Sequence, residues 1–265
     1  MDFNDIAATL KAAGYPPRKA EAKIAHDIVL KAIEDAGFHD KVTIKGGVVM
    51  SGISDAVRRA TIDMDFDFLG YSLGDASIRR FVQRLNRVAG CEVRIEGEIQ
   101  ELRQGEYKGM RANLVLTDDA GRSIRTKVDI GVHGNKLIEQ VDFRFKVVSD
   151  DAGVVLLVNS KEQIFVEKLK SLLKLGVVST RYKDVYDLYY LCSRVDAKVL
   201  GDYLRICIFE DVGMLENDVR DIERRLGRIF SSKTFLKRLA NPDYAWIDEP
   251  VEKVIETLLE FFRGI

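Results

Sequence analysis

Three carboxylates stand at alternate positions in the segment 62–68, and their spacing is the strongest chemical signal in the chain. Asp63, Asp65 and Asp67 alternate there with apolar residues. Such strict alternation predicts a β-strand with one buried face, so that the acidic side chains share the other face. Like charges on one face repel each other, and a divalent cation such as Mg²⁺ would offset them because hard ions prefer carboxylate oxygens.

A pair of glycines upstream of the acidic segment adds a second signal. Gly46 and Gly47 lie between a short predicted strand, 42–44, and an apolar segment, 48–53, that is predicted to begin a helix. Backbone N–H groups at glycines can approach a phosphate closely, and the N-terminus of a helix attracts anions. A glycine turn followed by an acidic strand therefore predicts phosphate chemistry assisted by metal ions. Arg59, between the two motifs, is a candidate for neutralising the phosphates.

A further carboxylate lies in the predicted strand 123–132. One face of that strand is mostly apolar, and Asp129 belongs to the other face together with Lys127 and Arg125. If this strand lies beside the acidic strand, Asp129 can face the same metal ion. The alternative interpretation is a structural ion pair between Asp129 and Lys127 or Arg125.

Two helical segments carry charged residues on their apolar sides. A helical wheel places Lys168 in the apolar arc of 164–175, and it places Asp184 and Asp187 beside apolar residues of 181–191. A buried lysine needs an anionic partner, so we expect Lys168 to pair with one of these carboxylates or with a ligand phosphate. The alternative is that its ammonium group reaches water along the aliphatic stem.

The elements that must position these groups follow from the hydrophobic periodicity. We expect helices in 1–40 and a helix that Asp75 caps. Strands are expected over 93–99, 111–116, 123–132, 141–148 and 154–158, with a hairpin turn at 118–121. The fold class is therefore α+β, a mixed β-sheet core flanked by helices and followed by a mostly helical C-terminal part. The expected domains are an N-terminal helical segment, the sheet core and a helical C-terminal domain, over 1–40, 41–158 and 159–265.

Composition sets broader limits on function. The chain has 265 residues, of which 46% are hydrophobic and 31% are charged, as in ordinary globular proteins. Its net charge of −1 gives no overall basic field that would attract a polyanion. The N-terminus is too polar for a signal peptide, and no apolar run reaches the ~20 residues that a membrane helix needs. Three scattered cysteines without CxxC spacing are expected to be reduced, so we expect a cytoplasmic protein without membrane contact.

Other catalytic classes lack their signatures in this sequence. The three histidines form no constellation with serine, cysteine or aspartate, and no GxxxxGK phosphate-binding loop is present. The tyrosines of 182–190 are interpreted as packing residues rather than a platform for stacking bases. The basic residues of 220–228 alternate with acidic ones, and we interpret them as a solvated helix face rather than an RNA-binding patch.

Four sequence blocks, in their order and spacing, resemble the AbiEii/AbiGii nucleotidyltransferase toxin family of the polymerase-β-like nucleotidyltransferase superfamily. The blocks are KGGVVM, RRATIDMDF, VEKLKSLL and RYKDVYDLYYL, and the resemblance spans roughly 40–195. Any one block is a weak signal, whereas the combination is specific. The resemblance implies that 41–158 is a nucleotidyltransferase core with a helical tail. It also implies the toxin half of a two-gene toxin–antitoxin or phage-defence system.

The resemblance assigns roles to the residues of the core. Gly46 and Gly47 match the glycine motif beside the triphosphate of the nucleotide. Asp63 and Asp65 match the catalytic DxD pair that binds metal. Asp129 fits the third carboxylate of the superfamily, as a catalytic and metal-binding residue.

The later blocks add catalytic residues, and two positions depart from the family pattern. Lys168 matches the motif lysine that contacts the nucleotide, and Asp184 or Asp187 matches the late acidic motif, with the helical wheel favouring Asp184. Many members carry Ser or Thr at or just after the second glycine, where this chain has Val48. The DxD pair is extended by Asp67, which we interpret as a bystander.

These residues together predict a metal-dependent nucleotidyltransferase. An acceptor hydroxyl would attack the α-phosphate of an NTP and release pyrophosphate, assisted by two Mg²⁺ (or Mn²⁺) ions ~3.5–4 Å apart. The family resemblance implies an RNA acceptor, tRNA in particular, and a cognate antitoxin protein as partner. Two alternatives stay open: transfer to a protein or small molecule, and a non-catalytic nucleotide- or antitoxin-binding module on the same fold.

Overall fold

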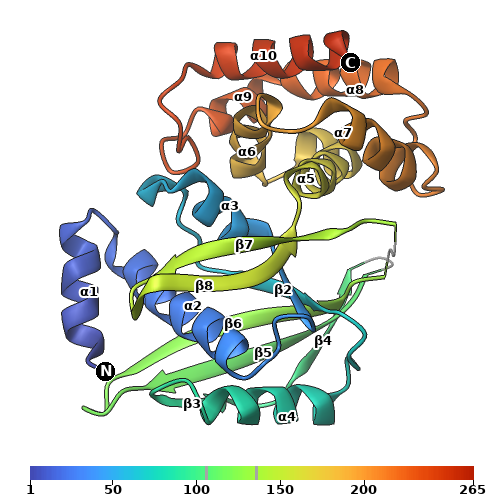
Figure 1. Cartoon of the computed structure of the whole chain (residues 1–265). Coiled ribbons are helices and arrows are strands. Elements are labelled where there is room, and N and C mark those ends of the chain that lie inside the picture. Colours follow the sequence, from blue (N-terminus) through green and yellow to red (C-terminus); the bar gives the residue numbers. More distant parts are fainter. Residues whose placement is uncertain (105–106, 135–136) are drawn as a thin grey trace. The chain divides into compact units, whose positions relative to one another are not determined.

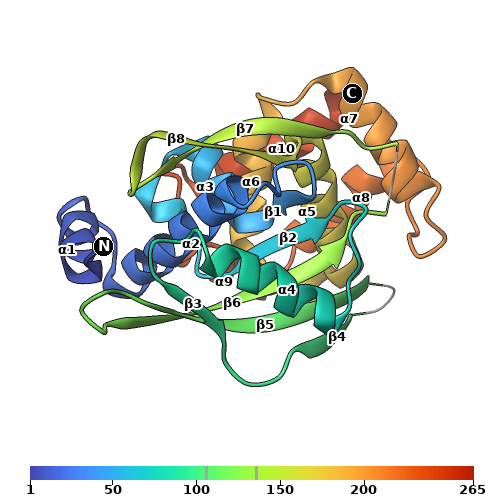
Figure 2. The same cartoon turned by 60° about the horizontal axis from the view of Figure 1, so that its bottom comes forward.

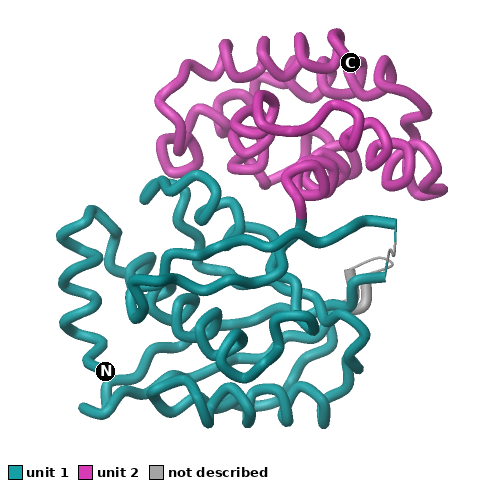
Figure 3. The backbone as a smooth tube through the Cα atoms, viewed as in Figure 1, with its two compact units in different colours: residues 1–159 teal, residues 160–265 magenta. Residues whose placement is uncertain are grey.

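The computed structural model of the chain describes residues 1–104, 107–134 and 137–265. Two units divide the chain, Met1–Asn159 and Ser160–Ile265, which we call the first and second unit (Figure 3). Every strand of the described residues belongs to the first unit, and the second unit is helical. The helical segment 1–40 lies in the same unit as the sheet. The α+β fold class expected from the sequence is confirmed.

The first unit contains both helices and strands. Its helices are Phe3–Ala12 (α1), Pro17–Asp35 (α2), Gly46–Ser54 (α3) and Asp75–Asn86 (α4), with a 3-10 turn at Val57–Arg59 (η1). Its strands are Val42–Lys45 (β1), Met64–Phe68 (β2), Glu92–Ile95 (β3), Gln100–Gln104 (β4), Tyr107–Thr117 (β5), Ser123–Val132 (β6), Gln140–Val147 (β7) and Asp150–Asn159 (β8).

The strands of the first unit form one mixed sheet, with β2 in its interior (Figures 1 and 2). The order is β3-β5-β6-β2-β1-β8-β7, and β4 pairs with β5 outside this path. β2 runs antiparallel to β1 and parallel to β6, which places Asp65 opposite Lys45 on one side and opposite Asp129 on the other. Arg111 of β5 lies opposite Asp129 in turn. Because directly paired residues point to the same face, one row of four charged side chains crosses four adjacent strands.

The other face of β2 is apolar and packs against α4. The rings of Phe66 and Phe68 lie 5.7 Å and 5.2 Å from the ring of Phe81 in α4, between centroids. Phe66 pairs with Ile44 of β1 and Ile130 of β6, and all of these side chains are buried. Burying one such side chain contributes about 1.5–3 kcal/mol. The apolar alternation therefore decides which face of β2 meets the helices and leaves the aspartates on the other face.

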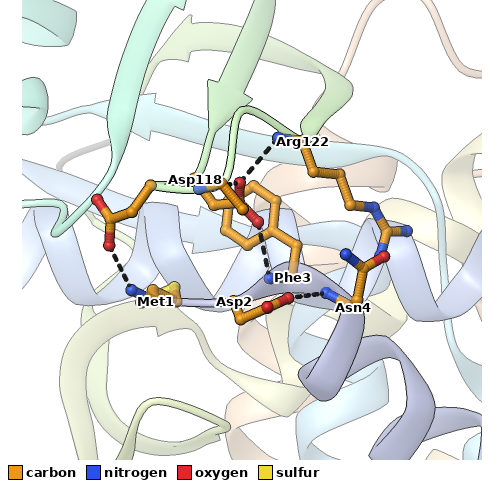
Figure 4. A network of polar contacts seen from close by, with 8 residues as sticks. Met1, Asp2, Phe3, Asn4, Asp118 and Arg122 are labelled. Atoms are coloured by element: carbon orange, nitrogen blue, oxygen red, sulfur yellow. Dashed lines mark hydrogen bonds and ion pairs between the residues drawn. The ribbon is translucent and has the colours of Figure 1, made fainter.

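A polar network attaches the N-terminus of α1 to the turn between β5 and β6 (Figure 4). The buried carboxylate of Asp118 accepts hydrogen bonds from the backbone N–H of Phe3 at 2.9 Å and of Arg122 at 2.8 Å. These donors lower the pKa of the Asp118 carboxyl. The amino group of Met1 pairs with Asp119 at 2.7 Å. The predicted hairpin turn at 118–121 is present, and it also anchors the first helix.

Three local predictions need correction. The helix expected over 48–53 begins at Gly46, directly after β1, so the two glycines open the helix instead of forming a separate turn. The strand expected over 93–99 ends at Ile95, because Gly97 has a φ of +76° that an extended strand does not adopt, and β4 begins after it. Asp75 does not cap α4, since Gly74 occupies that position and Asp75 pairs with Arg79 instead.

The acidic segment also differs from its prediction. β2 begins at Met64, so Asp63 lies in the segment before the strand, with a side chain that is 57% exposed. Asp67 lies within β2 and is buried. The three carboxylates therefore occupy three different environments, because the strand is shorter than the alternating sequence pattern.

The second unit consists of helices that pack against one another. Their bounds are Lys161–Leu175 (α5), Tyr182–Cys192 (α6), Ala197–Leu204 (α7), Val219–Phe230 (α8), Lys233–Leu239 (α9) and Val251–Gly264 (α10), with short helical turns at Gly176–Val178 (η2) and Arg205–Phe209 (η3). Among the described residues, no helix combines the length and the apolar character needed to cross a membrane.

The cysteines Cys91, Cys192 and Cys207 are free thiols. Burial raises the pKa of Cys91 to about 11 and that of Cys192 to about 12. Thiols with such pKa values are protonated at neutral pH and are poor nucleophiles. The free thiols agree with the reduced state expected from the sequence.

His26 of α2 is a buried histidine whose protonation opposes folding. Its side chain donates a hydrogen bond from Nε2 to the carbonyl oxygen of Ile62 at 3.2 Å. Burial lowers the pKa of His26 from 6.5 to about 4. The unfolded chain therefore binds more protons than the folded chain between these two values, and the free energy of unfolding falls as the pH drops below 6.5.

We expect the His26→Gln variant to lose this part of the pH dependence, because an amide can keep the hydrogen bond to Ile62 without titrating. Between pH 7 and pH 5 the wild type should lose about 2 kcal/mol more stability than the variant. Urea unfolding at both pH values measures the difference. His39→Gln, at a side chain that is 43% exposed, is the control and should follow the wild type. Equal losses of stability between pH 7 and pH 5 in the wild type and both variants would contradict the assignment of this pH dependence to His26.

Candidate active site

The junction between β1 and α3 brings the glycine motif against the acidic strand. Gly46, the first residue of α3, has a φ of +67°, a conformation that glycine adopts without strain. A Cβ atom at Gly46 would lie 2.9 Å from Oδ2 of Asp65, and one at Gly47 would lie 2.8 Å from Oγ1 of Thr61. Both glycines therefore permit close approach of a polar side chain. The carboxylate of Asp65 lies at the N-terminus of a helix, where negative charge is stabilised.

The N-terminus of α3 is suited to bind an anion. Lys45, at the N-cap position, makes no side-chain capping hydrogen bond. The first N–H groups of a helix have no partner within the helix, and they bind phosphate readily. Val48 is buried, so a phosphate at this helix would meet backbone N–H groups rather than a hydroxyl at that position.

Asp129 is held by an arginine of the neighbouring strand. Nε of Arg111 donates to Oδ1 of Asp129 and Nη2 donates to Oδ2, each at 2.7 Å. Two parallel charge-assisted hydrogen bonds of this kind are strong and directional. The hydrogen bonds to Asp129 raise the pKa of the Arg111 guanidinium, and the charges of Asp63 and Asp65 raise it further. The three predicted metal-binding carboxylates thus act on one guanidinium group.

Two lysines balance the other acidic side chains. Lys127 pairs with Asp63 at 2.8 Å, and Lys45 pairs with Asp67 at 2.5 Å. The sequence interpretation invoked a divalent cation as the offset for the aspartates. The structure shows basic side chains in that role, because strands on both sides of β2 carry them on the same face.

The alternative interpretation of Asp129, as a residue in a structural ion pair, was wrong about its partners. Asp129 forms an ion pair, but with Arg111 rather than with Lys127 or Arg125, which pair with Asp63 and Glu96. Sequence reasoning did not consider Arg111. The cross-strand register would have revealed it, since Arg111 lies directly opposite Asp129, but no local pattern encodes that register.

The fit of these carboxylates to a metal ion rests on their chemistry. Among the residues that the structure describes, no three His, Cys, Asp or Glu side chains converge closely enough to hold an ion. Lys127 and Arg111 hold Asp63 and Asp129 through their carboxylate oxygens. Mg²⁺ needs only one or two protein carboxylates together with phosphate oxygens, and the paired Asp65 and Asp129 supply them. The donor set therefore fits a hard divalent cation, and the role of the three residues as ligands stays a prediction.

Arg59 lies in η1, which stands between α3 and β2 in the sequence. Its side chain is buried, with only 4% of its surface exposed. The preceding residue, Arg58, accepts a hydrogen bond at its carbonyl from Nζ of Lys19, which attaches the segment to α2. The expected phosphate-binding role of Arg59 stays a prediction.

The second unit contains its own buried ionic cluster. Nζ of Lys168 lies 2.6 Å from Oδ1 of Asp184 and 2.8 Å from Oδ2 of Asp187. Lys168 thus pairs with both carboxylates, and its ammonium group does not extend to water. Trp246 donates from Nε1 to Oδ1 of Asp187 at 3.0 Å, which satisfies the second carboxylate oxygen. The Asp187 side chain is fully buried, whereas that of Asp184 is 12% exposed and lies 3.7 Å from Arg181. Of the two carboxylates, Asp184 is therefore the one a ligand can reach.

Two of the four tyrosines of α6 pack in the core as the sequence analysis expects, and the other two, Tyr189 and Tyr190, are partly exposed. Tyr182 and Tyr186 are buried, and the ring of Tyr182 lies 5.2 Å from that of Phe235. In α8, Arg224 pairs with Asp221, and Glu223 pairs with Arg263 of α10. These pairs agree with a solvated helix face.

The first unit is a mixed sheet whose strand–helix junction places two glycines beside a strand with aspartates. The family model "Nucleotidyl transferase AbiEii toxin, Type IV TA system" matches residues 28–244 of the chain. The chain belongs to this family. It is therefore a nucleotidyltransferase, of a family described as toxins of type IV toxin–antitoxin systems.

Other comparisons add little to the family assignment. No curated protein matches the chain. Among solved structures, that of the antibiotic-resistance factor ANT(2'')-Ia, described for its substrate-regulated conformation dynamics, is similar at 15% identity and a TM-score of 0.39. The match covers 70% of this chain and 91% of that one. At this level of similarity it carries no argument about the site.

We expect Gly46→Ala to distort the site, because the new Cβ would clash with Asp65 and would impose a left-handed conformation on alanine. The conformational cost alone is about 1–2 kcal/mol. Gly37→Ala is the matched control, since Gly37 has a φ of +71° and no atom lies within 4 Å of the position that a Cβ would take there. Urea unfolding should show a larger loss for Gly46→Ala than for Gly37→Ala, and nucleotide transfer should fall in Gly46→Ala alone. Equal losses in both variants would contradict the close approach.

We expect Lys168→Met to destabilise the second unit, because Asp184 and Asp187 would remain buried without their cation. Breaking a buried pair in this way costs about 3–5 kcal/mol. Lys170→Met on the same helix is the control, since the partly exposed pair of Lys170 and Asp211 should contribute about 1 kcal/mol or less. Denaturant unfolding measures both. A loss for Lys168→Met no larger than that of the control would show that the cluster is not structural.

Proposed function

We propose that this protein transfers a nucleoside monophosphate from an NTP to a hydroxyl group of RNA, tRNA in particular, with divalent metal ions. It acts in the cytoplasm as the toxin of a toxin–antitoxin or phage-defence pair. The observation that carries the proposal is the strand register that pairs Asp65 with Asp129 on one sheet face, beside the N-terminus of α3. Membership of the AbiEii family supports the reaction class.

The residues of the first unit would bind the nucleotide and the metal. Backbone N–H groups at Gly46 and Gly47 would bind the triphosphate, as helix N-termini bind phosphate in general. Asp63, Asp65 and Asp129 would hold Mg²⁺ or Mn²⁺. A bound divalent ion neutralises phosphate oxygens and lowers the pKa of the attacking hydroxyl.

The reaction joins the acceptor to the α-phosphate. The acceptor oxygen forms a bond to the α-phosphorus, the bond from that phosphorus to the bridging oxygen of the β-phosphate breaks, and pyrophosphate leaves. The acceptor proton passes to a carboxylate of the site or to water. Positively charged side chains stabilise the charge that develops on pyrophosphate, and the proposal assigns this role in the first unit to Arg59. Lys168 is proposed separately, as a catalytic residue of the second unit. Asp184 would orient Lys168, with which it forms an ion pair.

RNA is proposed as acceptor because of the resemblance to family members that modify tRNA. The charged face of α8 does not argue for or against it, since Arg224 has its own acidic partner. The choice of acceptor is therefore a question for direct assay.

We expect label from an α-labelled NTP to appear in the RNA fraction when the protein is incubated with total RNA, a protein extract and Mg²⁺ or Mn²⁺. Asp63→Asn and Asp65→Asn should lower the transfer at least about 100-fold, since even residues that only support metal ligands contribute 10- to 100-fold. The Asp63 side chain is 57% exposed, so its replacement leaves the fold intact. Each of the four NTPs is tested separately, and circular dichroism checks the fold.

Glu96→Gln is the control variant, because Glu96 is an exposed carboxylate that pairs with Arg125, on the β6 strand that also carries Asp129. It should keep full activity. Label in the protein or small-molecule fraction would select a different acceptor. Absence of label in every fraction would indicate a non-catalytic binding module. Undiminished transfer by both aspartate variants would remove the proposed site.

A further inference from the structure

Arg111 stands out because its guanidinium group interacts with the carboxylates that are proposed to bind metal. It makes two hydrogen bonds of 2.7 Å to Asp129, and the charges of Asp63 and Asp65 act on it as well. Its position is set by the long β5–β6 ladder, in which Arg111 and Asp129 are direct partners. The Arg111 side chain is 30% exposed and that of Asp129 is 21% exposed. Both groups can therefore exchange partners without leaving a charge buried.

We propose that Arg111 is a positioning residue that competes with divalent metal for Asp129, so that metal and nucleotide bind this protein together rather than independently. The inference rests on the proposed function, because it takes Asp129 to be a metal ligand. The inference goes beyond the proposed function by naming a residue that sets the affinities for metal and nucleotide.

The competition follows from the geometry of the pair. A metal ion that binds Asp129 must take carboxylate oxygens that already accept two charge-assisted hydrogen bonds, and both bonds are lost or weakened. A positive guanidinium beside the site also repels the cation. Together these effects should weaken metal binding by about 10- to 100-fold, which corresponds to the strength of a hydrogen bond to a charged group.

The nucleotide offers Arg111 a replacement partner. Guanidinium groups bind phosphate in the same two-pronged manner as carboxylate. A triphosphate at the N-terminus of α3 would approach the face on which Asp65 and Asp129 lie, because Asp65 lies against Gly46. If Arg111 moves to a phosphate, Asp129 becomes available to the metal. Each ligand then strengthens binding of the other by the same factor, as linkage requires.

A second arginine–carboxylate pair on the same sheet provides a comparison. Arg125 of β6 pairs with Glu96 at 3.0 Å, with side chains that are 67% and 41% exposed. Among the described residues, Glu96 is the carboxylate whose hydrogen bond and charge raise the pKa of Arg125. Arg125 therefore resembles Arg111 chemically but does not share in the cluster around Asp65.

Direct Mn²⁺ binding tests the inference without an activity assay. Electron paramagnetic resonance measures free Mn²⁺ in titrations of the full-length wild type, Arg111→Gln and Arg125→Gln, each with and without an NTP analogue that has a non-cleavable α,β-bond. We expect Arg111→Gln to bind Mn²⁺ about 10-fold tighter or more than the wild type when no nucleotide is present. Arg125→Gln should match the wild type. The analogue should tighten Mn²⁺ binding strongly in the wild type and much less in Arg111→Gln.

Further variants keep the result interpretable. Arg111→Lys retains the charge but loses the two-pronged contact, so its Mn²⁺ affinity should fall between those of the wild type and Arg111→Gln. This variant replaces Arg111→Gln in the test if Arg111→Gln does not fold. Adding Asp129→Asn to Arg111→Gln should remove the gain. Equal Mn²⁺ affinity in wild type and Arg111→Gln, with binding that Asp65→Asn abolishes, would overturn the inference and leave the proposed function intact. Absence of Mn²⁺ binding in every protein, even with the analogue, would overturn both.

Discussion

The pairing of β2 between β1 and β6 is the interaction on which the rest of the site depends. The register places Lys45, Asp65, Asp129 and Arg111 in one row across the sheet. The opposite face of β2 is held by buried aromatic and aliphatic side chains, including Phe66. A shift of the β2 register by one residue would bury the aspartates in the apolar layer and expose the phenylalanines to solvent. Both changes would destabilise the fold. Hydrophobic packing on one face therefore orders the charges on the other.

Charge balance takes different forms in the two units. In the first unit, acidic and basic side chains alternate on a partly exposed sheet face, and ion pairs such as Arg111–Asp129 can exchange partners with a ligand. In the second unit, Lys168 is enclosed with Asp184 and Asp187, and Trp246 satisfies a remaining carboxylate oxygen. Enclosed pairs are costly to break, whereas exposed pairs contribute little and rearrange easily. The first unit is thus suited to binding ions and the cluster of the second unit to holding a lysine in place.

The glycine junction depends on glycine itself rather than on the residue that follows it. Val48 is buried, so it serves the core rather than a ligand. The close approach of Asp65 to Gly46 depends on the absence of a side chain and on a positive φ, and both are properties of glycine alone. In the proposed site a phosphate would meet the backbone at the start of α3, and not a hydroxyl at position 48.

The sequence by itself determined the elements and the chemical types at the site. The acidic alternation, the glycine pair and the lysine on an apolar helix face are local periodicities, and each reports which side of an element is buried. Only the tertiary structure decided the partners: Arg111 for Asp129, Lys127 for Asp63, and both Asp184 and Asp187 for Lys168. Partners across strands or helices depend on strand order, register and helix packing. Those arise from contacts between residues far apart in the chain, which no local pattern encodes.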